Sequence, residues 1–255
     1  MRTFFFVFAL LLYAAAAATA QMTEEIETDR PDQTETPFLV PRKFIQAEFG
    51  MSAEKYGAGR SQLVHPASLL KYGLSNRFEL RLETTVLTEY LPYIPATKTN
   101  TLLQPVEVGT KLRLFEEKGA RPKASLITHI SLPFAASKQL RSGTPSYAAR
   151  LSLQNSLTKN ISLGYNLGVE KSDEPTAFFY TFAPGFSLGE KWYAYVEAFG
   201  SFANNVAEHN LDGGLAYFIS HNTKIDLSSG FGLGDSPLKN YVAIGLSFRL
   251  SLCKP

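Results

Sequence analysis

Arg77-Phe-Glu-Leu-Arg-Leu-Glu83 has an apolar residue at every second position and a charged residue at each position between. Residues Ile161 to Glu170 repeat this alternation, with small polar residues in place of most of the charges. Successive side chains of a β-strand point to opposite faces, so each segment predicts a strand with one apolar and one polar face. The pattern recurs from about Phe44 to Leu250 and predicts an all-β chain.

The first twenty residues predict export. Met1-Arg-Thr is a short basic start, Phe4 to Ala18 is a run of apolar or small residues, and Ala18-Thr-Ala20 has the small-x-small cleavage pattern. We therefore expect residues 1–20 to be a secretory signal peptide and Gln21 to begin the mature chain. An uncleaved anchor is the alternative, and the short apolar run favours the signal peptide.

Length and composition narrow the class of protein. Residues 21–255 suffice for one all-β domain, and no apolar stretch near 18 residues follows the signal, so we expect no transmembrane helix. The net charge of +2 gives no reason to expect a nucleic-acid partner. The single cysteine, Cys253, has no partner for an intrachain disulfide.

Segment length and spacing favour a membrane barrel over a soluble sandwich. The segments that alternate are 42–56, 61–74, 77–90, 102–115, 122–134, 145–157, 160–171, 176–188, 191–202, 210–219, 223–232 and 239–251. Strands of soluble proteins usually have about 5–6 residues, whereas strands that cross a bilayer need about 9–11. Tight turns alternate with longer links, such as 91–101, 135–145 and 203–209, as in outer-membrane barrels.

We therefore predict a transmembrane, antiparallel, up-and-down β-barrel of about 12 strands over residues 42–252, placed in the bacterial outer membrane. A soluble periplasmic β-sandwich or open barrel is the alternative. The last segment, Tyr241 to Leu250, resembles the C-terminal signal that the barrel-assembly machinery recognises, although Ser251 to Pro255 follow it. The expected partners are this machinery, outer-membrane lipids and a small-molecule solute.

The two faces of the segments separate by charge. We expect the apolar face to contact lipid and the polar face to line the lumen. Aromatic residues near segment ends, such as Tyr90, Trp192 and Tyr217, would lie at the membrane interfaces. The charged residues expected to line the lumen are Glu48, Glu79, Arg81, Glu83, Glu107, Lys111, Arg113, Lys123, Arg150, Glu170, Glu197, Asp226 and Arg249.

Residues 21–41 show neither strand nor helix period and are acidic. The block Thr28-Asp-Arg-Pro-Asp-Gln-Thr-Glu35, followed by Val40-Pro41 and by Phe44 to Gly50, resembles the start of mature proteins in the family named for a meta-pathway of phenol degradation. The resemblance implies an exported bacterial β-barrel that acts as a transporter. The family name further implies passage of hydrophobic or aromatic compounds. The motif residues are Thr28, Asp29, Arg30, Pro31 and Asp32.

Two placements of this N-terminal segment are open. It can fold into the lumen as a plug, or it can remain in the periplasm as a leader to the first strand, with Asp29 and Arg30 paired locally. Lys111, Arg113 and Lys123 concentrate positive charge near the expected periplasmic end of the barrel. We therefore expect the acidic segment to dock there by charge attraction.

Catalytic and metal-binding patterns are sparse. The four histidines are scattered, so we predict no metal site and no cofactor. His129-Ile-Ser131 can be compared with the His-x-Ser pair of outer-membrane phospholipase A, but Leu132-Pro133 follows in place of Asn-Gly. The sequence therefore predicts a channel or transporter for small solutes and not an enzyme. A structural or adhesion barrel with a closed lumen is the alternative, and an outer-membrane lipid hydrolase is less favoured.

Overall fold

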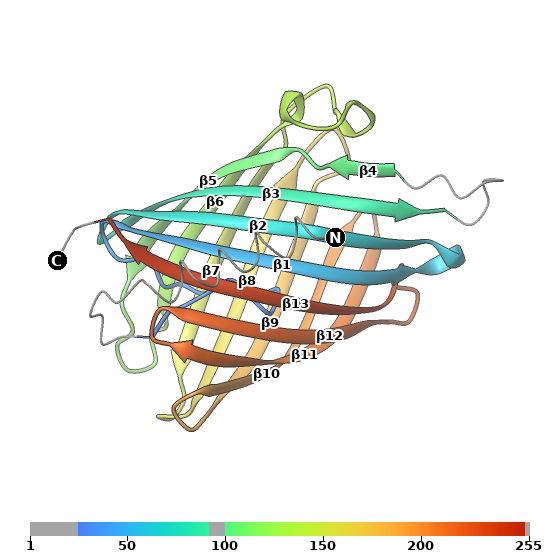
Figure 1. Ribbon diagram of the computed structural model, residues 1–255. Helices are drawn as coiled ribbons and strands as arrows, with labels where there is room; N and C mark the ends of the chain where they lie inside the picture. Colours follow the sequence, from blue (N-terminus) through green and yellow to red (C-terminus); the bar gives the residue numbers. More distant parts are fainter. Residues whose placement is uncertain (1–24, 92–99, 253–255) are drawn as a thin grey trace, which may run out of the picture.

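The computed structural model describes residues 25–91 and 100–252. The signal peptide expected at residues 1–20, and Cys253, lie outside the described part of the chain. The strands form one antiparallel sheet that closes into a barrel (Figure 1). They are β1 (Phe44–Tyr56), β2 (Ser61–Ser75), β3 (Phe78–Tyr90), β4 (Asn100–Leu103), β5 (Val106–Phe115), β6 (Lys123–Leu132), β7 (Tyr147–Ser156), β8 (Ile161–Lys171), β9 (Ala177–Leu188), β10 (Trp192–Ala203), β11 (Val206–Ser220), β12 (Thr223–Leu233) and β13 (Leu238–Ser251).

Pairing of the first and last strands closes the sheet. β1 pairs with β13 from Phe44 opposite Ser251 to Tyr56 opposite Leu238, and β2 pairs with both β1 and β3. β4 and β5 follow one another along the same edge of β3, separated by Gln104-Pro105, and so occupy one position in the wall. The wall therefore has twelve strand positions, which confirms the predicted antiparallel barrel of about 12 strands.

One predicted connection is wrong. Residues 203–209 were expected to form a long link, but β10 and β11 are joined by a turn at Asn204-Asn205, and β11 begins at Val206. Both asparagines have positive φ, 48° and 61°. Two-residue hairpin turns require this backbone, and asparagine tolerates it better than most residues. The Asn-Asn pair is thus a turn signal, which the prediction of a long link did not take into account.

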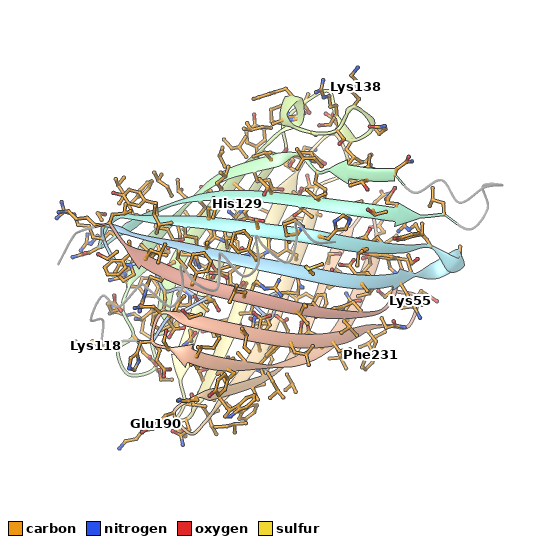
Figure 2. All side chains as sticks on the ribbon, in the orientation of Figure 1. Lys55, Lys118, His129, Lys138, Glu190 and Phe231 are labelled. Atoms are coloured by element: carbon orange, nitrogen blue, oxygen red, sulfur yellow. The ribbon has the colours of Figure 1, made fainter. Side chains whose placement is uncertain are left out.

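The alternation of β3 shows how the sequence places its side chains. Glu79 and Arg81 are buried, at 0% and 4% exposure, whereas Leu80 and Leu82 are 42% and 37% exposed. Polar side chains therefore face the interior and apolar ones the outside, and Figure 2 shows side chains on both faces of the wall. The apolar face is exposed elsewhere in the barrel too, as at Leu167 of β8 and Val196 of β10, which are 59% and 55% exposed. Such an outer surface matches lipid and is typical of outer-membrane barrels.

Helices contribute little to the described residues. Over residues 25–91 and 100–252 the helices are three short 3-10 helices, η1 (Gly57–Gly59), η2 (Pro133–Ala135) and η3 (Lys138–Leu140). None of the helices in the described part of the chain is long and apolar enough to cross a membrane. Leu140 of η3 packs against Val64 and Leu87, so the link between β6 and β7 contributes to a small apolar cluster at this end of the barrel.

A charge on the outer face should destabilise the barrel far more than a charge on the inner face. Leu167→Arg, near the middle of β8, should lower the free energy of unfolding by about 2–4 kcal/mol, because arginine loses its hydration in hydrocarbon. Gln154→Arg on β7, which lines an interior cavity of about 190 Å³, should change it by only about 0.5 kcal/mol. Urea titration of the barrel in lipid vesicles measures the free energy of unfolding of both variants. Equal losses would contradict the assignment of the faces.

Candidate functional site

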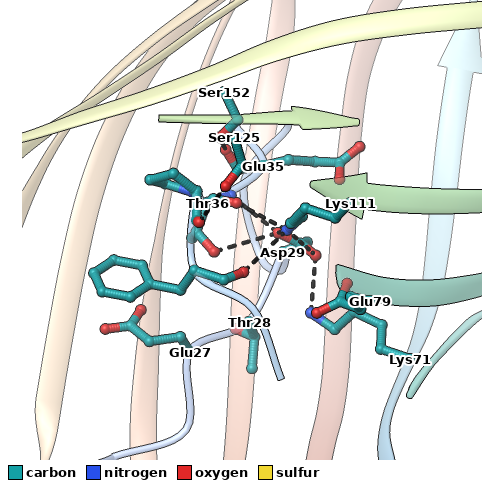
Figure 3. Close-up of polar contacts among 12 residues, drawn as sticks. Glu27, Thr28, Asp29, Glu35, Thr36, Lys71, Glu79, Lys111, Ser125 and Ser152 are labelled. Atoms are coloured by element: carbon teal, nitrogen blue, oxygen red, sulfur yellow. Dashed lines mark hydrogen bonds and ion pairs between the residues drawn. The ribbon is translucent and has the colours of Figure 1, made fainter. Parts of the chain in front are cut away.

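Residues 25–41, the inner segment, cross the interior of the barrel without forming helix or strand. Hydrogen bonds join them to side chains on β1, β2, β3, β5, β6, β7, β8, β9, β10 and β12. These strands lie on all sides of the wall, so the inner segment fills the middle of the lumen (Figure 3).

Side chains of the wall satisfy the backbone of the inner segment. The Val40 N–H donates to Glu79 at 2.7 Å, and the Glu35 N–H donates to Asn166 at 2.8 Å. The Ser152 hydroxyl donates to the Glu35 carbonyl at 2.5 Å. A buried backbone group without a partner costs free energy, so these wall residues let an irregular segment lie inside the barrel.

Asp29 is the centre of the polar network (Figure 3). Its carboxylate lies 2.8 Å from Lys71 Nζ, 3.0 Å from Arg81 Nη1 and 3.0 Å from Lys111 Nζ, and it accepts a hydrogen bond from the Thr36 N–H at 2.9 Å. Burial alone would raise the pKa of Asp29, but the three neighbouring cations hold that pKa well below its ordinary value. Asp29 is therefore a buried anion inside a ring of positive charge.

Arg30 anchors the inner segment on another part of the wall, at β12. Its Nη2 lies 3.0 Å from Asp226 Oδ1 on β12. Gly50 and Gly245 are directly opposite one another on β1 and β13, and a Cβ at either position would collide with the Arg30 guanidinium. The absence of side chains at these two positions makes the room that Arg30 occupies. Lys224, also on β12, donates to the Arg30 carbonyl at 2.7 Å.

A third anchor involves β9 and β10. The Thr34 hydroxyl lies 2.6 Å from the Thr181 hydroxyl and 2.5 Å from Glu197 Oε1. Glu35 follows at once, and its carboxylate pairs with Arg81 at 2.6 Å and with Arg150 at 3.4 Å. Within a few residues, the inner segment thus contacts widely separated strands.

Many of the sequence-predicted lumen residues bind the inner segment. Those with hydrogen bonds or ion pairs to it are Glu48, Glu79, Arg81, Lys111, Arg150, Glu197 and Asp226. Among the motif residues, Thr28 accepts a hydrogen bond from Lys224, Pro31 is buried, and Asp32 lines the cavity of about 190 Å³ beside Tyr193.

Other predicted lumen residues lie away from the centre of the network. Arg113 and Lys123 pair with Glu116 at 2.9 and 3.0 Å, at the end of the barrel where β5 turns into β6. The expected docking of the inner segment therefore involves Lys111 directly, while Lys123 lies over the ring of Phe38, with Nζ 4.0 Å from the ring centroid. The remaining predicted positions are Glu83 beside Arg81, half-buried Glu107 opposite Glu83, exposed Glu170, and buried Arg249 bonded to Asn222.

Several partners of the inner segment were not among the predicted lumen residues, for two different reasons. Lys71 lies directly opposite Arg81 across the β2–β3 hairpin. The tight turn between these strands was a signal that could have placed Lys71 on the inner face. Ser125, Ser152 and Asn166 are neutral, so a search for charged lumen residues could not select them.

His129 and Ser131 have separate hydrogen-bond partners. His129 Nε2 lies 2.9 Å from Glu83 and 3.2 Å from Arg81 Nε. The Ser131 hydroxyl accepts a hydrogen bond from the Ser146 N–H at 2.8 Å. Within the described residues no hydrogen bond joins His129 to Ser131, as a nucleophile and its base would require. The same part of the chain contains no group of acidic, histidine or cysteine residues suited to a metal ion.

Comparison with known proteins identifies the family. The family model described as "Putative MetA-pathway of phenol degradation" matches residues 28–250, so the chain belongs to this family, and the resemblance noted from the motif is confirmed. Among curated protein sequences, none matches this chain significantly.

Solved structures share the fold at low sequence identity. An outer membrane channel from Pseudomonas putida F1 has 8% identity and a TM-score of 0.66, over 88% of this chain and 100% of that chain. The NanC porin has 11% identity and a TM-score of 0.52, over 80% of this chain and 98% of that chain. The KdgM porin has 12% identity and a TM-score of 0.51, over 79% of this chain and 98% of that chain. The chain therefore has the fold of outer-membrane channels.

A side chain added at position 50, where Arg30 contacts the wall, should detach residues 25–35 from that part of the wall. Gly50→Leu should expose residues 25–35 to a Glu-specific protease, because the new side chain occupies the space of the Arg30 guanidinium. Gly143→Leu is the control, since its Cβ would meet only Asp173, at 3.8 Å. Mass spectrometry of the digested, folded barrel gives the cleavage sites. Equal protection of both variants would show that Arg30 does not hold the segment.

Proposed function

We propose that this family member is an outer-membrane channel for small solutes, and that the inner segment is a plug which must move for the lumen to conduct. The observation that carries the proposal is how the inner segment is held. Its contacts with the wall are mainly hydrogen bonds and ion pairs to inward-facing polar side chains. Water can replace such contacts, since the net contribution of a hydrogen bond to a charged group is only about 1.5–3 kcal/mol.

The size of the barrel supports this interpretation. Side chains fill the interior of a barrel of about 8 strands, whereas about 16–18 strands leave an open aqueous channel. Twelve strand positions lie between these limits, and here a separate polypeptide segment occupies the middle of the lumen. Movement of that segment would leave a passage lined by polar residues. A cavity of about 650 Å³, lined in part by Phe38 and Gln46, already lies beside the inner segment.

The names of the structural neighbours agree with a channel rather than an enzyme. They are an outer membrane channel and two porins, and the family description refers to phenol degradation. Passage of hydrophobic or aromatic solutes is the prediction that this description adds. A structural barrel with a permanently closed lumen is the second candidate, which the filled lumen itself favours.

Deletion of residues 22–35 should distinguish the two candidates. A channel should show higher conductance in planar bilayers after the deletion, because the middle of the lumen is emptied. The deleted residues contain six carboxylates and one arginine. Their loss should therefore also shift the selectivity towards anions. Absence of conductance in the folded deletion variant would favour the closed structural barrel.

A reversible cross-link is the matched control for that deletion. Thr34→Cys with Thr181→Cys joins the inner segment to β9, where the two native hydroxyls lie 2.6 Å apart. Cys253→Ser removes the native thiol. The oxidised barrel should conduct no more than the wild type does, and reduction should restore any opening of the wild-type channel. Higher conductance in the oxidised state would exclude the segment as the moving part.

A further inference from the structure

Three cations on neighbouring strands point to one place in the lumen. Lys71 of β2 lies directly opposite Arg81 of β3, and Glu79 of β3 lies opposite Lys111 of β5. The strand register therefore brings these three cations together independently of the inner segment. All three are at most 4% exposed, and all three contact Asp29.

The wall alone satisfies these cations only in part, because Lys71 also pairs with Glu48 of β1, whereas Lys111 has no ion pair with a wall carboxylate among the described residues. Within the described residues, every hydrogen bond that Lys111 Nζ donates goes to the inner segment, to Asp29, the Thr36 carbonyl and the Phe38 carbonyl. Arg81 lies only 3.5 and 3.4 Å from the wall carboxylates Glu79 and Glu83. Its contact with Asp29 is shorter, at 3.0 Å. A buried cation without an anion is costly, so Lys111 requires an anionic partner when the inner segment leaves.

The contacts of Asp29 have the shape of a carboxylate site. Oδ1 accepts from Lys111 at 3.0 Å and from the Thr36 N–H at 2.9 Å. Oδ2 accepts from Lys71 at 2.8 Å and from Arg81 at 3.0 Å. Lys111 Nζ also lies 3.2 Å from Oδ2 and so bridges the two oxygens. Donors on both oxygens fit a planar group with two oxygens better than a spherical ion.

We infer that Lys71, Arg81 and Lys111 form a carboxylate-binding site in the lumen, which Asp29 fills when the inner segment is docked and which a small monocarboxylate solute fills when the segment leaves. This inference rests on the proposed channel function and adds a class of solute to it. Glu48 and Glu79 flank the cations. Their negative charge disfavours an anion with more than one charge, such as phosphate.

The same exchange explains how a solute would favour the open channel. A carboxylate in the lumen competes with Asp29 for the three cations, and it shifts the population only by its differential affinity for the undocked state. The site therefore combines recognition of the solute with release of the inner segment.

Chemical rescue tests the inference. Asp29→Ala removes one carboxylate, and formate supplies a carboxylate of the size that is lost. In planar bilayers, Asp29→Ala should raise the conductance by weakening the docking of the inner segment. Formate should lower it again, because no Asp29 carboxylate is left to compete and the docked segment adds the Thr36 N–H donor to the vacant position, whereas chloride at equal ionic strength should not. Lys111→Gln in the Asp29→Ala background should weaken the effect of formate about tenfold or more, since it removes a charge-assisted donor. Asp235→Ala, at an exposed turn, is the matched control and should conduct as the wild type does.

The barrel without residues 22–35 provides a second measurement that does not depend on folding of the Asp29 variant. There the permeability ratio of formate to chloride, from the reversal potential, should exceed one and should fall on Lys111→Gln. If this barrel conducts but neither measurement responds to formate, the carboxylate site is wrong and the channel function stands. If phosphate acts as strongly as formate, the preference for monocarboxylates is wrong. If neither variant conducts, the channel function itself fails.

Discussion

The requirement that every backbone N–H and C=O be hydrogen-bonded within lipid determines the rest of this structure. The sheet meets it by closing β1 on β13 along almost the whole of both strands. Closure creates an enclosed interior, and contact with lipid turns the apolar face outward. Burial is consequently the reverse of that in a water-soluble protein. Lys111 and Glu79 are fully buried, whereas Leu167 is 59% exposed.

Such an interior cannot be stabilised by apolar packing, so charge pairing takes its place. The apolar clusters among the described buried residues are small, one around Ala47 and one around Val64. Removal of one partner from a dry ion pair costs about 3–5 kcal/mol. In a lumen that water can enter, hydration of the exposed charges offsets much of this cost. The free energy that holds the inner segment in the lumen is therefore the difference between its ion pairs with the wall and the hydration of the same charges after it leaves. In an apolar core, by contrast, burial of apolar surface supplies most of the stabilisation.

The period of the sequence was sufficient to predict the barrel, because lipid outside and polar groups inside impose one alternation on every strand. The missed turn at Asn204-Asn205 changed the length of one hairpin without affecting the fold. The site was harder to predict. The motif around Asp29 and the basic position Lys111 could be found from the sequence, but their contact depends on a segment without any period. Lys71 was missed because its placement follows from the register of a hairpin and not from its own strand alone.

The way in which the inner segment joins the wall limits how it can move. Lys43 has a left-handed backbone, with φ of 66°, and its N–H donates to the Gly73 carbonyl at 2.8 Å. The Phe44 N–H donates to the Pro41 carbonyl at 3.0 Å, so a tight turn reverses the chain just before β1. Because this turn is tied to β2, the inner segment stays attached at one end of the barrel. The contacts of Asp29, Arg30 and Thr34 lie on three separate parts of the wall. Loss of one contact frees and exposes the part of the inner segment that it holds, whereas release of the whole segment requires all three to break.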